Sequence, residues 1–154
     1  MTLEVPDDRS DKIIGYRSYE GASARITSDE DLARVFRETV SEGLTHLGFR
    51  VVPSAGDGVR QLRLSIRELR SWYLHDRVYA KAMLNYEASY GGGRLRRDLG
   101  AEIDEMTLII PTAAGNQNRI NDVLSRSVDA VLQDKDLLSY LVSPSGFANK
   151  ESVK

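Results

Sequence analysis

The stretch RVYAKAMLNYEASY, residues 77–90, alternates between apolar and mostly polar side chains along its whole length. Side chains of a β-strand point to opposite faces in turn, so this alternation gives the strand one apolar face and one wet face. A strand of this length spans about 45 Å at about 3.3 Å per residue, and a strand this long is expected at the centre of a sheet. Its apolar positions are Val78, Ala80, Ala82, Leu84, Tyr86, Ala88 and Tyr90. The small alanines leave room for a helix on that face.

Two further long strands are expected on either side, over residues 59–73 and 94–109. In the first, apolar side chains occupy even positions as far as Ile66 and then an odd position at Leu69, which predicts a β-bulge near 67–68. The connections are short and turn-like, so the three strands form a meander. The turns are His75-Asp76 and Gly91-Gly92-Gly93.

Two long segments carry apolar side chains at helical spacing. Residues 28–47 begin with Ser28 as a helix cap and Asp31 three residues later, a capping-box-like pair. Residues 113–133 follow Thr112, a second plausible cap, and a short helix opens at 134 or 135. Short extended segments are expected at 1–6, 13–16, 24–27 and 50–52, and Gly15 indicates a bulge or a close backbone approach.

These patterns predict an α+β fold, a two-layer sandwich with a mostly antiparallel sheet and helices 28–47 and 113–133 on one face. We expect a single domain over residues 1–142 and a disordered tail over 143–154, which is polar and contains Pro144 and Gly146.

Composition narrows the function classes. The net charge of −2 gives no general attraction to nucleic acid, and we expect no nucleic-acid partner. The absence of cysteine excludes thiol nucleophiles and cysteine-bound metals. The acidic turn at Asp7, Asp8 and Asp11 lacks the spacing of a calcium loop, so we interpret it as solvated. We expect no metal and no cofactor.

The familiar active-site motifs are also missing, including the serine elbow, the phosphate-binding loop and the zinc-binding helix. His75 lies beside Asp76 in a turn, but no serine can be assigned to it as a nucleophile. We therefore expect no catalytic residues and a protein that is not an enzyme.

One cluster of side chains is a candidate binding site, at the end of the first hairpin. Aromatic residues with flanking arginines are typical of protein-contact hot spots. The candidate residues are Trp72, Tyr73, His75, Tyr79, Arg70 and Arg77. We expect Tyr73 and Tyr79 to lie close across the turn on the wet face. The alternative is a hairpin that is merely stabilised by a cross-strand tyrosine pair.

A series of short segments, in order, resembles the YajG-like family of bacterial lipoproteins over about residues 2–142. The segments are Val5-Pro6-Asp7-Asp8-Arg9, Ile14-Gly15-Tyr16-Arg17, Ile26-Thr27-Ser28, Gly48-Phe49, Pro111-Thr112-Ala113-Ala114, Asn116, Ile120-Asn121, Asp136-Leu137-Leu138 and Leu141. The resemblance implies a domain that is tethered to the outer membrane by an N-terminal lipid and faces the periplasm. It supplies no catalytic residues. The lipid-bearing cysteine and signal peptide that it places before Thr2 are not among these 154 residues, so the anchor rests on the resemblance.

Three functions follow as hypotheses. The first is a non-catalytic envelope domain that binds a protein or another envelope component. The second is a carrier of a small molecule or lipid, with a cavity between helices and sheet lined by Ala80, Ala82 and Ala88. The third is a hydrolase that uses His75. A buried apolar cavity would favour the carrier, and an exposed aromatic patch would favour partner binding.

Overall fold

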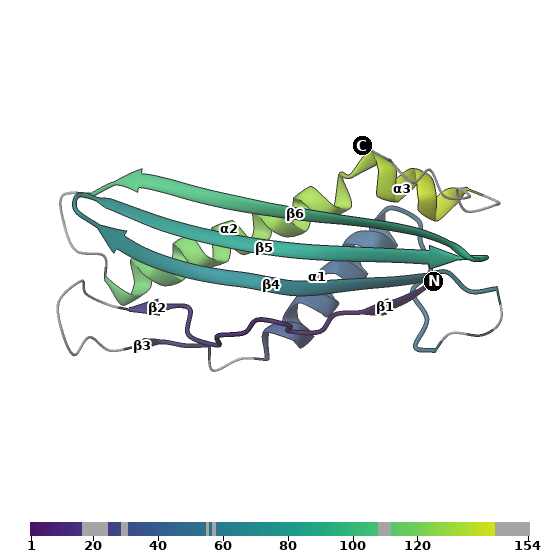
Figure 1. The fold of residues 1–154 in the computed structure, drawn as a ribbon, viewed down its shortest axis with the longest axis horizontal. Helices are drawn as coiled ribbons and strands as arrows, with labels where there is room; N and C mark the ends of the chain where they lie inside the picture. Colours follow the sequence, from purple (N-terminus) through teal and green to yellow (C-terminus); the bar gives the residue numbers. More distant parts are fainter. Residues whose placement is uncertain (17–24, 29–30, 55, 57, 108–111, 144–154) are drawn as a thin grey trace.

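The structure is a computed structural model that describes residues 1–16, 25–28, 31–54, 56, 58–107 and 112–143. A sheet forms one layer, and all the helices lie against one of its faces (Figure 1). The predicted two-layer α+β sandwich is confirmed. In chain order the elements are β1 (Thr2–Glu4), β2 (Gly15–Tyr16), β3 (Arg25–Ile26), α1 (Leu32–His46), β4 (Gln61–Leu74), β5 (Arg77–Tyr90), β6 (Gly93–Met106), α2 (Ala113–Leu132) and α3 (Lys135–Val142).

The predicted meander forms the centre of the sheet. β4, β5 and β6 pair antiparallel in chain order, and β5 lies in the middle. The register between β4 and β5 shifts between Ile66 and Glu68. A bulge was predicted here because the apolar residues move from even to odd positions. The N-terminal segment runs along the other edge of β4, with β1 and β2 parallel to it and β3 antiparallel to β2.

Gly15 is required where β2 meets β4. A Cβ atom at this position would lie 2.0 Å from the backbone oxygen of Ser71. The close backbone approach predicted for Gly15 is confirmed, and no other residue fits without moving one strand away from the other.

Several element boundaries differ from the prediction. Helix α1 begins at Leu32, and its cap is Asp31, whose side chain accepts a hydrogen bond from the Arg34 amide at 3.1 Å. Ser28 was the wrong choice of cap because aspartate caps equally well and stands directly before the apolar periodicity. Helix α2 keeps its predicted start, with Thr112 as the cap. The last residues of the predicted strand 94–109 and all but the first residue of the predicted tail lie outside the described residues.

The predicted strand at 50–52 is not one of the strands of the sheet. Its backbone makes two hydrogen bonds with Met1, in which Met1 donates to Arg50 at 2.8 Å and Val52 donates to Met1 at 2.9 Å. The pairing stops at Met1, and Pro53, whose ring fixes the backbone φ, follows this segment directly.

The core lies between the sheet and the helices. Val40 and Leu44 of α1 and Val131 of α2 are fully buried against the even-numbered residues of β5. A second apolar cluster joins Ile120 and Val123 of α2 to the other half of the sheet. Every even-numbered residue of β5 from Val78 to Ala88 is buried, as the alternation predicted.

Helix α3 is fixed to β6 by charge. Asp134 caps it by accepting hydrogen bonds from the amides of Asp136 and Leu137, and its other oxygen lies 3.0 Å from Arg97. Burial alone would raise the pKa of Asp134, but the two amides and Arg97 together hold it below the usual value.

Candidate functional site

The face of the sheet opposite the helices carries most of the predicted hairpin cluster. β4 and β5 are joined by a two-residue turn, His75-Asp76, and His75 adopts a positive φ of 57° there. On the uncovered face Trp72 pairs with Tyr79, and their rings stack with centroids 5.1 Å apart and an interplanar angle of 7°. Both side chains are half-buried.

The predicted contact between Tyr73 and Tyr79 is wrong. Tyr73 pairs with Val78 and lies on the face that the helices cover. The bulge before Glu68 adds one residue to β4, so beyond it the odd-numbered residues, not the even-numbered ones, face the helices. Tyr73 therefore shares a face with the buried Leu69 and Ser71. The aromatic partner of Tyr79 is therefore Trp72.

Two exposed apolar residues extend this cluster and were not predicted. The row next to the turn runs from Leu74 across Arg77 to Met106, and these three side chains share the uncovered face. Leu74 is 37% exposed and Met106 is 66% exposed. We name the group Trp72, Leu74, Tyr79 and Met106 the hairpin patch. Pairing the residues of β5 and β6 outward from the turn between them would have placed Met106 opposite Arg77.

The basic residues of the predicted site are mostly paired. Arg77 lies 2.6 Å from Asp104, which holds the pKa of Arg77 above its usual value. Arg70 and Lys81 both approach Glu68, at 3.9 and 3.1 Å. His75 is exposed at the tip of the turn. The hairpin patch is thus an apolar and aromatic surface beside side chains whose charges are paired.

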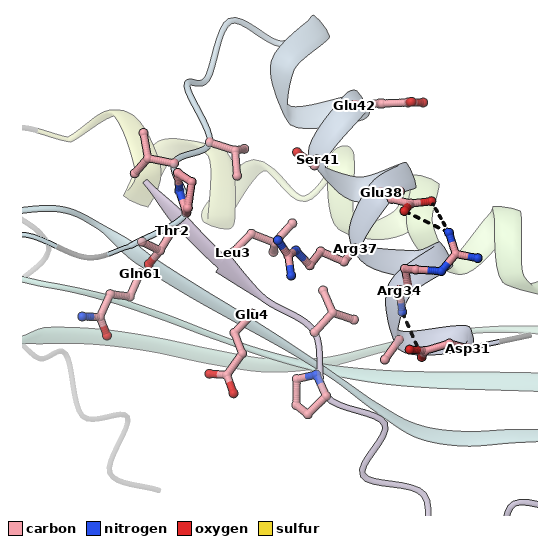
Figure 2. A pocket seen from close by; sticks show the side chains of 16 residues that line it. Thr2, Leu3, Glu4, Asp31, Arg34, Arg37, Glu38, Ser41, Glu42 and Gln61 are labelled. Atoms are coloured by element: carbon pink, nitrogen blue, oxygen red, sulfur yellow. Dashed lines mark hydrogen bonds and ion pairs between the residues drawn. The ribbon is translucent and has the colours of Figure 1, made fainter.

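A second feature is a groove of about 1110 Å³ between β1 and the outer side of α1. Residues 2–6 form one wall, and residues 51–53 close one end. Figure 2 shows Arg37 reaching from α1 towards β1, while Asp31, Arg34 and Glu38 are joined by their own hydrogen bonds. The pattern of the sequence did not predict this groove, because it depends on how two elements distant in sequence pack.

The far end of this groove wall is fixed by a partly buried ion pair. Arg9 is 8% exposed and binds both carboxylate oxygens of Asp7, at 2.8 and 2.9 Å. Lys12 donates to the backbone oxygen of Asp7 at 2.8 Å. The hydrogen bonds from Arg9 are the main cause that lowers the pKa of Asp7 to about 2.

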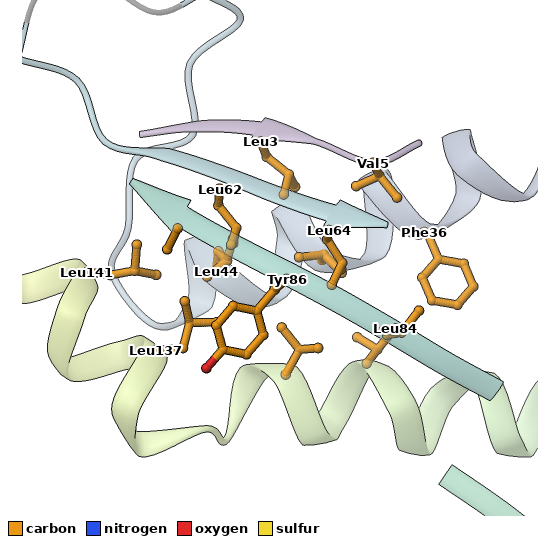
Figure 3. Close-up of a cluster of buried hydrophobic side chains, with 14 of the residues drawn as sticks. Leu3, Val5, Phe36, Leu44, Leu62, Leu64, Leu84, Tyr86, Leu137 and Leu141 are labelled. Carbon is orange, nitrogen blue, oxygen red and sulfur yellow. The ribbon is translucent and has the colours of Figure 1, made fainter. Parts of the chain in front are cut away.

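The three alanines considered for a carrier cavity lie in packed regions. Ala80, Ala82 and Ala88 have no exposed surface and belong to the two apolar clusters. Figure 3 shows the Tyr86 ring beside Leu137 with Leu44 close by, and Ala88 belongs to the same buried cluster as these three residues. Burial raises the pKa of Tyr86 above its usual value.

Comparisons with known proteins fit this architecture. Residues 1–142 match a protein family described as uncharacterized lipoprotein. No curated protein matches the chain significantly. The fold is similar to rare lipoprotein B from Shewanella oneidensis, at 16% identity and a TM-score of 0.50 over 86% of this chain and 92% of that chain. It is also similar to the crystal structure of an uncharacterized protein, at 12% identity and a TM-score of 0.50 over 83% and 88%.

The family match carries the assignment, because structural likeness at such identities concerns the fold alone. In the part of the chain that the structure describes, no helix is long and apolar enough to cross a bilayer. Membership in a lipoprotein family implies a location in the cell envelope with a membrane anchor. The match spans every described helix and strand, and the chain belongs to this family of lipoproteins.

Proposed function

We propose that this lipoprotein domain is non-catalytic, faces the periplasm from the outer membrane and binds a protein of the cell envelope through the hairpin patch. The observation that carries the proposal is the stacked Trp72–Tyr79 pair on a sheet face that none of the described helices covers. Aromatic residues and methionine are enriched in protein interfaces, and rigid aromatic side chains lose little entropy on binding.

The charges around the hairpin patch support a protein partner over nucleic acid. Arg77 and Lys81 each have an acidic neighbour, so they present little net positive charge to a phosphate backbone. A partner that covers the patch would gain from the exposed surface of Leu74 and Met106 without breaking these pairs.

The test places a photocrosslinking amino acid at Tyr79 in cells that make the lipidated protein. Ser89 is the matched control position, since it lies on the same face of β5 and ten residues away, about 33 Å along the strand. We expect one envelope protein to crosslink from position 79 and not from position 89, and the crosslink to disappear when Trp72→Ser is added. Equal crosslinking from both positions would contradict the proposal.

A further inference from the structure

The exposed edge of β1 has backbone groups that face away from the sheet. Even-numbered residues of this segment pair with β4: Thr2 donates to Arg60 at 2.8 Å, and Pro6 accepts from Ile66 at 3.0 Å. Hydrogen-bonding groups alternate sides along a strand, so the N–H and C=O groups of Leu3 and Val5 point to the other side. Within the described residues, these four groups have no hydrogen-bond partner.

Both ends of this edge are already occupied. At one end residues 50–52 make two strand-like hydrogen bonds with Met1, on the same side that Leu3 and Val5 leave open. At the other end Lys12 donates to the Asp7 oxygen. The open stretch is therefore bounded, and the chain itself shows that this edge accepts an extended segment.

The groove described above lies along this open stretch. Its floor is the outer side of α1, where Ala33, Arg37 and Ser41 follow one another at four-residue spacing. These positions span about 12 Å, close to the length of a four-residue strand. The two small residues leave space on either side of Arg37, and Arg37 makes no ion pair with any described residue.

We propose that an extended peptide segment of a partner protein adds to the edge of β1 as a further strand, with an Asp or Glu side chain directed at Arg37. Backbone hydrogen bonds to Leu3 and Val5 supply the affinity that such strand addition uses, and the Arg37 contact supplies selectivity. This site is separate from the hairpin patch and does not depend on it.

A second copy of this chain fits the edge less well than a peptide does. Pairing two β1 edges would bring the two Arg37 side chains towards each other, and like charges oppose such a contact. The opposite edge of the sheet, β6, is a poorer site because its exposed residues are largely charged, which is how natural edge strands avoid further pairing.

The test uses a blocked eight-residue peptide of alternating threonine and valine with one central aspartate. We expect its binding to slow hydrogen exchange at the Leu3 and Val5 amides, while the already bonded amides of Thr2 and Asp8 change little. A peptide N-methylated at every residue should not bind, because neither of its edges can then donate hydrogen bonds to β1. Protection along β6 instead, or protection of Leu3 and Val5 that rises with protein concentration in the absence of peptide, would overturn the proposal.

Charge reversal tests the role of Arg37. We expect Arg37→Glu to weaken the aspartate peptide about tenfold and to favour the same peptide with lysine in place of aspartate. The matched control is Arg96→Glu, since Arg96 is also exposed and unpaired among the described residues but lies on β6. Equal loss in both variants would exclude the Arg37 contact. Variants of the hairpin patch should leave peptide binding unchanged, so failure here is distinguishable from failure of the proposed function.

Discussion

At the scale of single residues, the buried charged side chains of the described chain are Arg9 and Asp134, and each has an oppositely charged partner. Arg9 and Asp7 form a bidentate pair two residues apart, beside the point where the N-terminal segment bridges to Ile66. Such a pair holds local geometry, and removal of one partner leaves the other charge buried without compensation.

The Asp7 pair predicts an acid-dependent part of the stability. The folded pKa of Asp7 is about 2 and lies below the ordinary 3.8, so its contribution is present above pH 4 and is lost as the pH falls towards 2. The shift corresponds to about 2 kcal/mol, and the carboxylate is only 20% exposed. We expect Asp7→Asn to lower the free energy of unfolding at pH 7 by about this amount.

Denaturant titrations between pH 2 and pH 7 measure this effect. The variant should show a flatter dependence on pH below pH 5 than the parent. Asp129→Asn on α2 is the control, since Asp129 is exposed and has no ion pair among the described residues. An unchanged pH slope in Asp7→Asn would show that the pair contributes little.

A second residue-scale prediction concerns Leu84 at the centre of the core. Leu84→Asp places an unpaired charge between sheet and helices, where Leu84 is 1% exposed, and should cost more than about 3 kcal/mol. Thermal unfolding followed by circular dichroism measures it. Ser89→Asp, on the uncovered face of the same strand, should remain within about 1 kcal/mol of the parent.

At the scale of elements, the sequence pattern predicts the large pieces well because their periodicity repeats many times. The three long strands and both main helices each contain several turns or pairs of residues, so one misleading position does not change the assignment. Boundaries depend on single residues instead, and Ser28 and Asp31 are both good caps. The face on which Tyr73 lies depends on one bulge. The sequence indicated that bulge, but its effect was not carried through to Tyr73.

Gly15 provides the prediction at this scale, because it decides whether β2 can join the sheet. A Cβ atom would collide with the backbone of Ser71, so Gly15→Ala should separate β2 from β4 and cost about 2–3 kcal/mol. Hydrogen exchange should then speed up at the Ser71 amide, which donates to Ile14. Gly56→Ala is the control, since no atom of the described residues lies within 4 Å of the added carbon. Equal stability of both variants would refute the close approach.

At the scale of the whole molecule, the two candidate sites differ in how far the sequence could predict them. The hairpin patch was partly predictable, because a two-residue turn fixes which residues of the two strands lie opposite each other. Leu74 and Met106 follow from the same pairing. The groove beside β1 was not predictable, because it requires knowing that α1 projects past an edge strand nearly thirty residues earlier in the chain.

The hairpin patch also predicts a separation of stability from binding. The double variant Trp72→Ser with Tyr79→Ser loses one stacked pair, which should cost about 1 kcal/mol, while co-purification of the partner identified by crosslinking should fall at least tenfold per folded molecule. Calorimetry and partner recovery from the same preparations measure the two effects. A loss of stability with unchanged recovery would make the pair structural.

The parallel course of β1 along β4 has a mechanical consequence. A pull on the Met1 end acts along β1, across hydrogen bonds that join it side by side to β4 and continue beyond it to Ile66. Such bonds resist in shear, so they must break together rather than open one after another as a zipper does. A tension applied through an N-terminal tether would therefore load these hydrogen bonds in shear, and releasing the first strand would take more force than opening the same bonds one at a time.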